Sequence, residues 1–261
     1  MSGGAALRTQ VGQLALRSVL RTARQPAQIV PALVFPLFLL AVNTGGLDAA
    51  TSIPGFPSDS YLAFALAVPF IQGGLFAVMN GGTDLARDIE TGFLDRLALT
   101  PLSGIGLVVG QLAGVLAMGG LSAIFYTVVG LAAGAGLQAG PGGFLVLLAL
   151  ALTITLAFGA LGVFAALRLG TGEAVQGLFP VLFVFLFLSS MSLPRNLIET
   201  DWFRTIATYN PVSYLIEGVR SLFITGWDAE ALALAFGVAV AMSALFLAAA
   251  SVSLRGRLVR T

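Results

Sequence analysis

The amino-acid sequence predicts an all-α polytopic membrane protein, with six transmembrane helices in a single domain covering residues 1–261. Of these residues, 57% are hydrophobic and 10% are charged, whereas a soluble globular domain is about half apolar and about a quarter charged. Six apolar segments are each long enough to cross a hydrocarbon core, which takes roughly 20 helical residues. Six of the charged residues crowd into the stretch from Asp84 to Arg96, between two of these segments. Composition, segment length and charge clustering therefore agree on the fold class.

A helix over residues 5–24 precedes the first crossing and is predicted to lie on the membrane surface. At about 100° per residue its polar side chains fall on one stripe, with apolar residues opposite. The stripe consists of Gln10, Gln13, Arg17, Arg21 and Arg24. Such an amphipathic helix is typical of the interface, where its arginines face lipid phosphates or a cytoplasmic partner. A simple membrane anchor and a contact with a partner both remain open.

The six predicted crossings contain no Asp, Glu, Lys, Arg or His. They cover residues 29–47, 61–82, 102–137, 144–167, 174–193 and 231–254. The third is longer than one crossing needs, which predicts a tilted helix or one that projects beyond the bilayer. Gly106, Gly110 and Gly114 recur in it every four residues, a spacing that favours close helix packing or, alternatively, a subunit interface.

The arginines orient the chain. With a cytoplasmic N-terminus, ten arginines fall on inside segments and three on outside segments, and cytoplasmic loops of membrane proteins are enriched in basic residues. The inside set is Arg8, Arg17, Arg21, Arg24, Arg87, Arg96, Arg168, Arg255, Arg257 and Arg260, and the outside set is Arg195, Arg204 and Arg220. Six crossings return the C-terminus to the cytoplasm, so both termini are expected inside.

A cytoplasmic helix is predicted over residues 83–101, between the second and third crossings. Thr83 can cap its start and Thr100-Pro101 can stop it. Its apolar residues recur every four positions, at Leu85, Ile89, Phe93 and Leu97, so the helix would lie across the membrane surface. The exposed face would carry Asp84, Arg87, Asp88 and Glu90. An acidic face suits a protein partner better than anionic lipid, and a solvated loop helix is the alternative.

An outer segment over residues 209–227 is predicted to enter the membrane and return. A helix from Val212 to Thr225 reaches about 21 Å, which is too short to cross. Glu217 and Arg220 lie three residues apart and can pair on one face. A plain folded loop is the alternative. The residues expected to cap, begin and stop this helix are Asn210, Pro211 and Gly226.

Missing residue types exclude several functions. All 13 basic residues are arginine, and the sequence holds no lysine, histidine or cysteine. A phosphate-binding GxxxxGK[ST] loop needs its lysine, so this chain cannot bind ATP in that way. The usual zinc, haem and iron–sulfur ligands are missing, as are thiol nucleophiles. Crossings without ionisable groups also weaken the case for an ion-coupled carrier or an intramembrane enzyme. A net charge of +1 gives no case for nucleic-acid binding.

Two motifs resemble those of ABC-2 type permeases, the membrane subunits of ATP-binding-cassette exporters. Residues Glu90 to Ser103 are similar to the pattern E-x-G-x₄-L-x₂-[ST]-P-x-[ST] between the second and third helices of that family. Residues Asn210 to Gly226 are similar to its NP-x₅-E-x₂-R-x₅-G signature before the last helix. With the six crossings and the N-terminal amphipathic helix, the resemblance covers nearly the whole chain.

The resemblance implies a division of labour between chains. Two six-helix halves would form a translocation path, the second half being an identical or a related permease. A separate nucleotide-binding subunit would bind ATP and Mg²⁺ and hydrolyse the ATP, so this chain would be no enzyme and would hold no cofactor itself. Residues 83–101 would seat in that subunit and 209–227 would shape the outer end of the path. The expected coupling residues are Asp84, Arg87, Asp88, Glu90, Gly92, Arg96, Thr100 and Pro101.

The expected function is therefore that of an exporter permease in a bacterial cytoplasmic membrane. No carbohydrate-binding domain is visible in the sequence, which favours a hydrophobic or amphipathic substrate, drug-like or lipid. Two alternatives stay open: a membrane scaffold or assembly subunit that transports nothing, and a permease for a polysaccharide or glycolipid.

Overall fold

The structure, a computed structural model, describes residues 3–93 and 104–258 and is helical in both parts, with no strand. Its long helices are α1 (Gly3–Ala23), α2 (Pro26–Leu47), α4 (Ala67–Glu90), α6 (Gly104–Ala132), α7 (Gly140–Leu169) and α12 (Ala229–Leu258). The shorter ones are η1 (Asp48–Ser52), α3 (Tyr61–Ala65), α8 (Gly172–Gln176), α9 (Phe179–Phe187), η2 (Arg195–Leu197), α10 (Asp201–Tyr209) and α11 (Pro211–Ile224).

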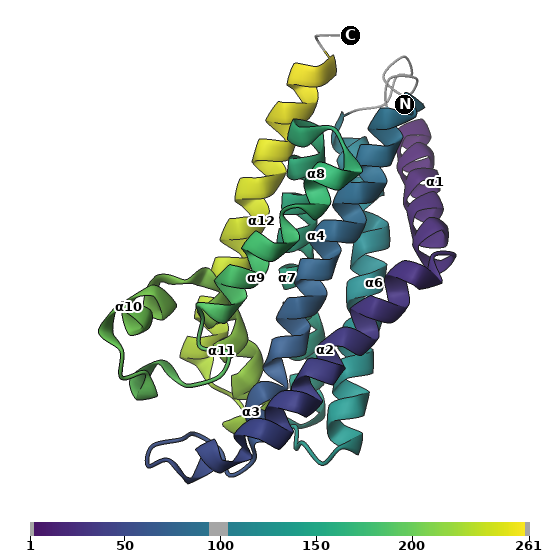
Figure 1. The fold of residues 1–261 in the computed structure, drawn as a ribbon. Helices are drawn as coiled ribbons and strands as arrows, with labels where there is room; N and C mark the ends of the chain where they lie inside the picture. The colour runs from purple at the N-terminus through teal and green to yellow at the C-terminus, as the bar shows by residue number, and fades with distance from the viewer. Residues whose placement is uncertain (1–2, 94–103, 259–261) are drawn as a thin grey trace.

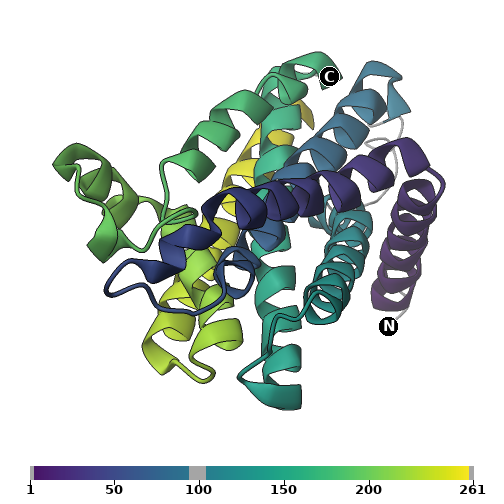
Figure 2. The same ribbon diagram turned by 60° about the horizontal axis from the view of Figure 1, so that its bottom comes forward.

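The helices form one bundle with two distinct ends (Figure 1). At one end lie α1, the last turns of α4, α8 and the last turns of α12, and we refer to this as the α1 end. At the other lie α3, α10 and the hairpin of α11 with the start of α12, which we refer to as the α11 end. Figure 2 shows α1 standing outside the bundle, beside α6.

Within residues 3–93 and 104–258, five helical segments are long and apolar enough to cross a membrane. They are Pro26–Ser52, Tyr61–Glu90, Val108–Ala132, Gly140–Leu169 and Ala229–Arg257, and each contains or overlaps one predicted crossing. The remaining prediction, 174–193, falls on α8 and α9, which together span Gly172–Phe187 and reach roughly 24 Å. Pro180 lies in the first turn of α9, where its missing N–H favours a helix start over a continuous helix. A sixth crossing therefore stays a prediction.

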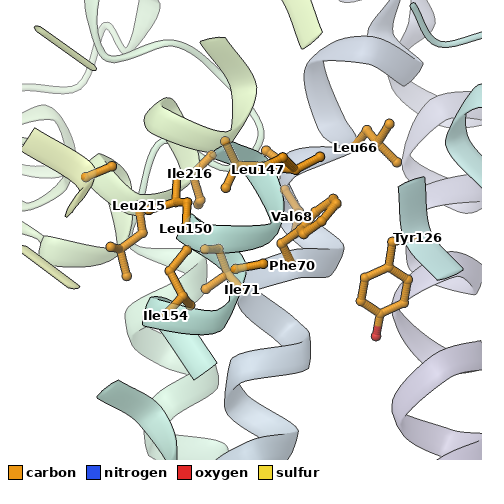
Figure 3. Close-up of a cluster of buried hydrophobic side chains, with 14 of the residues drawn as sticks. Leu66, Val68, Phe70, Ile71, Tyr126, Leu147, Leu150, Ile154, Leu215 and Ile216 are labelled. Carbon is orange, nitrogen blue, oxygen red and sulfur yellow. The ribbon is translucent and has the colours of Figure 1, made fainter. Parts of the chain in front are cut away.

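The core lies between α4, α7 and α11 (Figure 3). Ile71 from α4, Leu150 from α7 and Leu215 from α11 are each fully buried there. Of the most apolar window of Tyr61–Glu90, 78% is buried, against 22% for the window of α12 and 17% for that of α2. The α4 helix is therefore the central element, and α2 and α12 are peripheral. A Cβ on Gly162 of α7 would meet the backbone of Val78, so α4 and α7 touch backbone to backbone.

A proline in α2 explains one hydrogen bond between α2 and α6. Pro36 lies inside α2 and has no N–H to donate to the carbonyl of Ala32, four residues earlier. The buried hydroxyl of Tyr126, from α6, donates to that carbonyl instead. A partner from another helix thus satisfies an acceptor that the proline leaves free inside an apolar bundle.

The prediction of a separate helix starting at Thr83 is wrong, because α4 continues without a break to Glu90. The Thr83 hydroxyl donates to the carbonyl of Met79, four residues back, at 2.7 Å, as in a helix interior. Gly82 serves packing here, since a Cβ on it would lie 2.6 Å from Val175. The helix ends where Gly92 adopts a positive φ of 67°. Arg96, Thr100 and Pro101 lie outside the described residues.

The predicted N-terminal helix is confirmed as α1, and the glycine stripe of α6 packs against it. Cβ atoms on Gly110 and Gly114 would lie 2.6 Å from Leu14 and 2.5 Å from Ser18. Close helix packing therefore explains these two glycines. The placement of α1 on a membrane surface stays a prediction.

Candidate functional site

Charged residues from two distant helices meet at the α1 end, and we name this group the inner charged cluster. It consists of Arg17 and Arg21 from α1 and Asp84 and Asp88 from α4. Arg21 binds Asp84 and Asp88, each at 3.1 Å, and Arg17 binds Asp88 at 3.4 Å. The Arg17 guanidinium also lies 4.0 Å from the centre of the Phe93 ring. The sequence assigned these residues to two separate sites, and the structure unites them.

Helix geometry explains why the cluster forms. Residues four apart lie one above the other on a helix, so Arg17 and Arg21 form one pair on α1, and Asp84 and Asp88 form another on α4. Both aspartates are 7% exposed, and a buried carboxylate requires a partner charge. The two arginines supply it.

A neutral contact fixes α1 at this level of the bundle. The Ser18 hydroxyl donates to the carbonyl of Gln111 at 3.0 Å and accepts from the N–H of Gly114 at 3.2 Å. Both partners belong to α6, so α1 is held on α6 by hydrogen bonds and close packing while its arginines reach α4. This arrangement joins three helices into one unit.

The other expected coupling residues lie near the cluster but outside it. Arg87 and Glu90 are exposed, and the Glu90 carboxylate accepts from the N–H of Gly172 at 3.0 Å, which links the end of α4 to α8. Gly92 ends the helix. Arg24 is exposed after the end of α1 and takes part in no ion pair among residues 3–93 and 104–258.

A second polar group lies at the α11 end, and Asn210 is its first member. Its side-chain oxygen accepts from the N–H of Val212 at 2.9 Å, which caps α11, and Pro211 occupies the first turn. Its amide nitrogen donates to the carbonyls of Phe185 at 2.6 Å and Leu188 at 2.9 Å. One side chain therefore provides an acceptor for the N–H at the start of α11 and a donor for two carbonyls at the end of α9. The prediction that Asn210 caps this helix is confirmed.

The predicted pairing of Glu217 with Arg220 is wrong. Glu217 forms an ion pair with Arg195 and accepts from the Ser190 hydroxyl at 2.9 Å. Burial alone would lower the pKa of Arg195, but the Glu217 carboxylate and the Tyr214 side chain together outweigh this effect and raise the pKa above its ordinary value. We name Glu217, Arg195, Asn210, Arg220 and the carbonyls they bind the outer polar cluster.

Arg220 binds three backbone carbonyls instead of a carboxylate. It is 6% exposed and donates to Phe64 at 2.9 Å, Ser190 at 3.0 Å and Met191 at 3.2 Å. Its guanidinium also lies 3.5 Å from the centre of the Phe64 ring. The carbonyls of residues 190 and 191 follow the end of α9 and have no helical donor. Arg220 therefore joins α11 to the chain beyond α9 and to α3.

The predicted helix from Val212 to Thr225 is confirmed as α11. It stops where Gly226 adopts a φ of 86° and donates to the carbonyl of Ser221 at 2.8 Å. The chain then reverses into α12, which packs beside α11 (Figure 1). The depth of this hairpin in a membrane stays a prediction.

Sequence reasoning missed Arg195 and the role of Ser190. Their partner Glu217 lies 22 and 27 residues away, and neither interval corresponds to a helix or strand period. Only the fold brings them together. Within residues 3–93 and 104–258, no group of three or more Asp or Glu residues is placed to hold a metal ion.

Comparisons with known proteins match most of the chain. Residues 9–224 match the family model described as ABC-2 type transporter. Two similar proteins carry the name of a transport permease, ycf38. That of Porphyra purpurea is 27% identical over 223 residues, covering 84% of this chain and 76% of the relative. That of Pyropia yezoensis is 28% identical over 217 residues, covering 82% and 74%. The match includes both clusters, and the chain belongs to the ABC-2 type transporter family.

Proposed function

We propose that this chain is the permease half of an ATP-binding-cassette exporter that moves a hydrophobic or amphipathic molecule outward. A separate subunit would bind ATP and Mg²⁺ and hydrolyse the ATP, and a second permease, identical or related, would complete the path. The membrane would be a bacterial cytoplasmic membrane, with both termini inside. The family already identifies the chain as a membrane component of transport that is not itself catalytic.

The observation that carries the proposal is the path of α4 between the two clusters. Its start lies three residues after Phe64, whose carbonyl binds Arg220, and its last turns contain Asp84 and Asp88. The helix is unbroken over 24 residues, roughly 36 Å. A helix packed in a dense core moves as a rigid element. Displacement at its exposed end, beside Arg87 and Glu90, would therefore reach the outer polar cluster.

A groove on the bundle supports the proposed substrate class. It is an open space of about 440 Å³ between α2, α4, α8 and α9. Its apolar lining comes from Ala27, Pro31, Phe76, Met79 and Phe179, and its polar lining from Gln28, Asn80, Thr83 and Gln176. Apolar walls with a few polar groups are typical of small-molecule sites. A lipid or drug-like molecule fits this chemistry better than a long polysaccharide.

Purification of the chain with candidate ATPase subunits tests the proposal. We expect an ATPase to copurify, and the paired variant R87Q/E90Q to weaken that association at least several-fold. The matched control is R255Q, which removes an exposed arginine from the last turn of α12. Association that ignores the paired variant would contradict the coupling role. A complex that hydrolyses ATP but moves no lipid or drug-like compound in vesicles would favour the scaffold.

A further inference from the structure

An arginine-lined groove lies on the outward side of α1, where the chain turns into α2. It is an open space of about 530 Å³. Its polar lining comes from Gln13, Arg17, Arg21, Arg24 and Gln25, and its apolar lining from Leu16 and Leu20. The two leucines are 52% and 44% exposed. Basic and apolar surfaces therefore stand next to each other in one open site.

The groove carries an uncompensated positive charge. Arg17 and Arg21 bind the buried Asp84 and Asp88 behind α1, which balances two of the three arginines. Arg24 is exposed and is the arginine of the groove without an ion pair among the described residues. Arg17 is also 44% exposed at its side chain, so its guanidinium can serve an additional anion. A phosphate is suited to this pair, because guanidinium groups bind phosphate oxygens through paired hydrogen bonds.

The position of the groove favours a lipid over a soluble anion. The first segment long and apolar enough to cross a membrane, Pro26–Ser52, begins two residues after Arg24. With α1 on the membrane surface, the groove would therefore lie at the level of the lipid headgroups. A soluble anion gains nothing from Leu16 and Leu20, whereas an acyl chain covers both.

We infer that this groove binds an anionic phospholipid, with its phosphate between Arg17 and Arg24 and an acyl chain along Leu16 and Leu20. The lipid would share Arg17 with Asp88, so its binding would act on the inner charged cluster. This inference does not depend on the proposed export function, because lipid binding is measured on the chain alone.

Lipid retention measured by native mass spectrometry tests the inference. The full chain is exchanged into detergent containing equal amounts of phosphatidylglycerol and phosphatidylcholine. We expect the wild type to retain phosphatidylglycerol preferentially. The R24Q variant should retain it about tenfold less, as loss of one charge-assisted hydrogen bond implies. R24Q breaks no ion pair within the described part of the chain and should fold. The matched control R255Q, which removes an exposed arginine from the last turn of α12, should retain it as the wild type does.

Two further arms separate the lipid from other anions. The variant L16S/L20S should lose phosphatidylglycerol, and millimolar inorganic phosphate should not displace the lipid from the wild type. Equal retention by R24Q and R255Q would overturn the inference, and so would displacement by inorganic phosphate. If R24Q keeps the lipid but loses the ATPase subunit, an acidic protein segment occupies the groove instead.

Discussion

At the residue scale, the two clusters differ in what their arginines bind. In the inner charged cluster, arginines bind carboxylates, and charge is balanced by charge. In the outer polar cluster, Arg220 binds three carbonyls and the face of the Phe64 ring, and it forms no ion pair with a carboxylate among the described residues. The inner arginines therefore depend on particular partner residues, whereas Arg220 depends on the course of the backbone around it. These two kinds of dependence lead to different responses to substitution.

Replacing Arg220 with glutamine should destabilise the fold by roughly 2–4 kcal/mol, because buried carbonyls lose their donors. The thermal unfolding midpoint in detergent measures this. The matched control is R204Q, in α10, where Arg204 and its partner Asp201 are both exposed. Exposed pairs contribute about 0–1 kcal/mol, so this variant should unfold close to the wild type. Equal effects of R220Q and R204Q would show that the three carbonyl contacts are unimportant.

Removing Arg21 should cost stability through the carboxylates it leaves behind. Asp84 and Asp88 would stay buried with Arg17 alone, and breaking a buried pair on one side costs about 3–5 kcal/mol. The double variant R21Q/D84N should therefore recover part of the loss of R21Q, as measured by unfolding in a double-mutant cycle. Strictly additive losses would mean that the two side chains do not interact.

The inner charged cluster shows where sequence reasoning stops at this scale. The sequence shows the four-residue spacing of Arg17 with Arg21 and of Asp84 with Asp88, and it predicts each pair to belong to a site. It does not predict that the two pairs bind each other, because Arg21 and Asp88 are 67 residues apart. The register of α1 against α4 is set by a third helix, through the contact of Ser18 with α6.

At the element scale, two glycines determine whether α4 is predicted to end near Thr83 or to continue beyond it. Thr83 was predicted to cap the start of a new helix, and Gly81 and Gly82 stand directly before it, where glycine can interrupt a helix. In the fold, the same glycines let α4 approach its neighbours, with Gly82 facing Val175. The sequence alone cannot separate a glycine that breaks a helix from one that packs it. The helices α1, α6, α7, α11 and α12 were predictable, because no glycine before a capping residue suggests a false boundary inside them.

Replacing Gly82 with alanine should therefore destabilise the bundle by about 1–3 kcal/mol through overpacking. The added Cβ would lie 2.6 Å from Val175 and 3.0 Å from the carbonyl of Gly162. Gly237, inside α12, has nothing within 4 Å of an added Cβ. The control G237A should be neutral or stabilising by up to about 1 kcal/mol. Thermal unfolding compares the two variants, and a stabilised G82A would indicate that α4 and α8 do not touch there.

At the scale of the whole molecule, α4 connects two polar ends through an apolar core. If it transmits motion, a change at the α11 end should alter transport without altering assembly. We expect E217Q, which weakens the contact with Arg195, to leave association with the ATPase subunit within about twofold of the wild type. ATP-dependent transport in vesicles should fall several-fold. Loss of association in this variant would indicate general unfolding, and unchanged transport would remove the outer polar cluster from the path.

The overall architecture was largely predictable, and the reason is physical. An apolar solvent forces each crossing to satisfy its own backbone, so length and composition identify five helices that suit a membrane. The segment 174–193 is apolar too, but it contains the end of α8 and the separate helix α9, which has Pro180 in its first turn, so its crossing stays a prediction. An apolar composition shows that a segment can lie in lipid, but it does not show whether the segment forms one continuous helix, because a single residue can end a helix.

The hydrogen bond from Tyr126 to the Ala32 carbonyl, which Pro36 leaves without a helical donor, has a consequence for how the two positions evolve. The hydroxyl of Tyr126 is useful because the proline leaves the carbonyl of Ala32 without a donor. We expect Y126F to destabilise the wild type by about 1–3 kcal/mol but to be nearly neutral in a P36A background, which unfolding of the four variants would reveal. Selection would then act on positions 36 and 126 together. A relative that has lost the proline can lose the tyrosine hydroxyl at little cost, whereas losing the hydroxyl first would destabilise the fold.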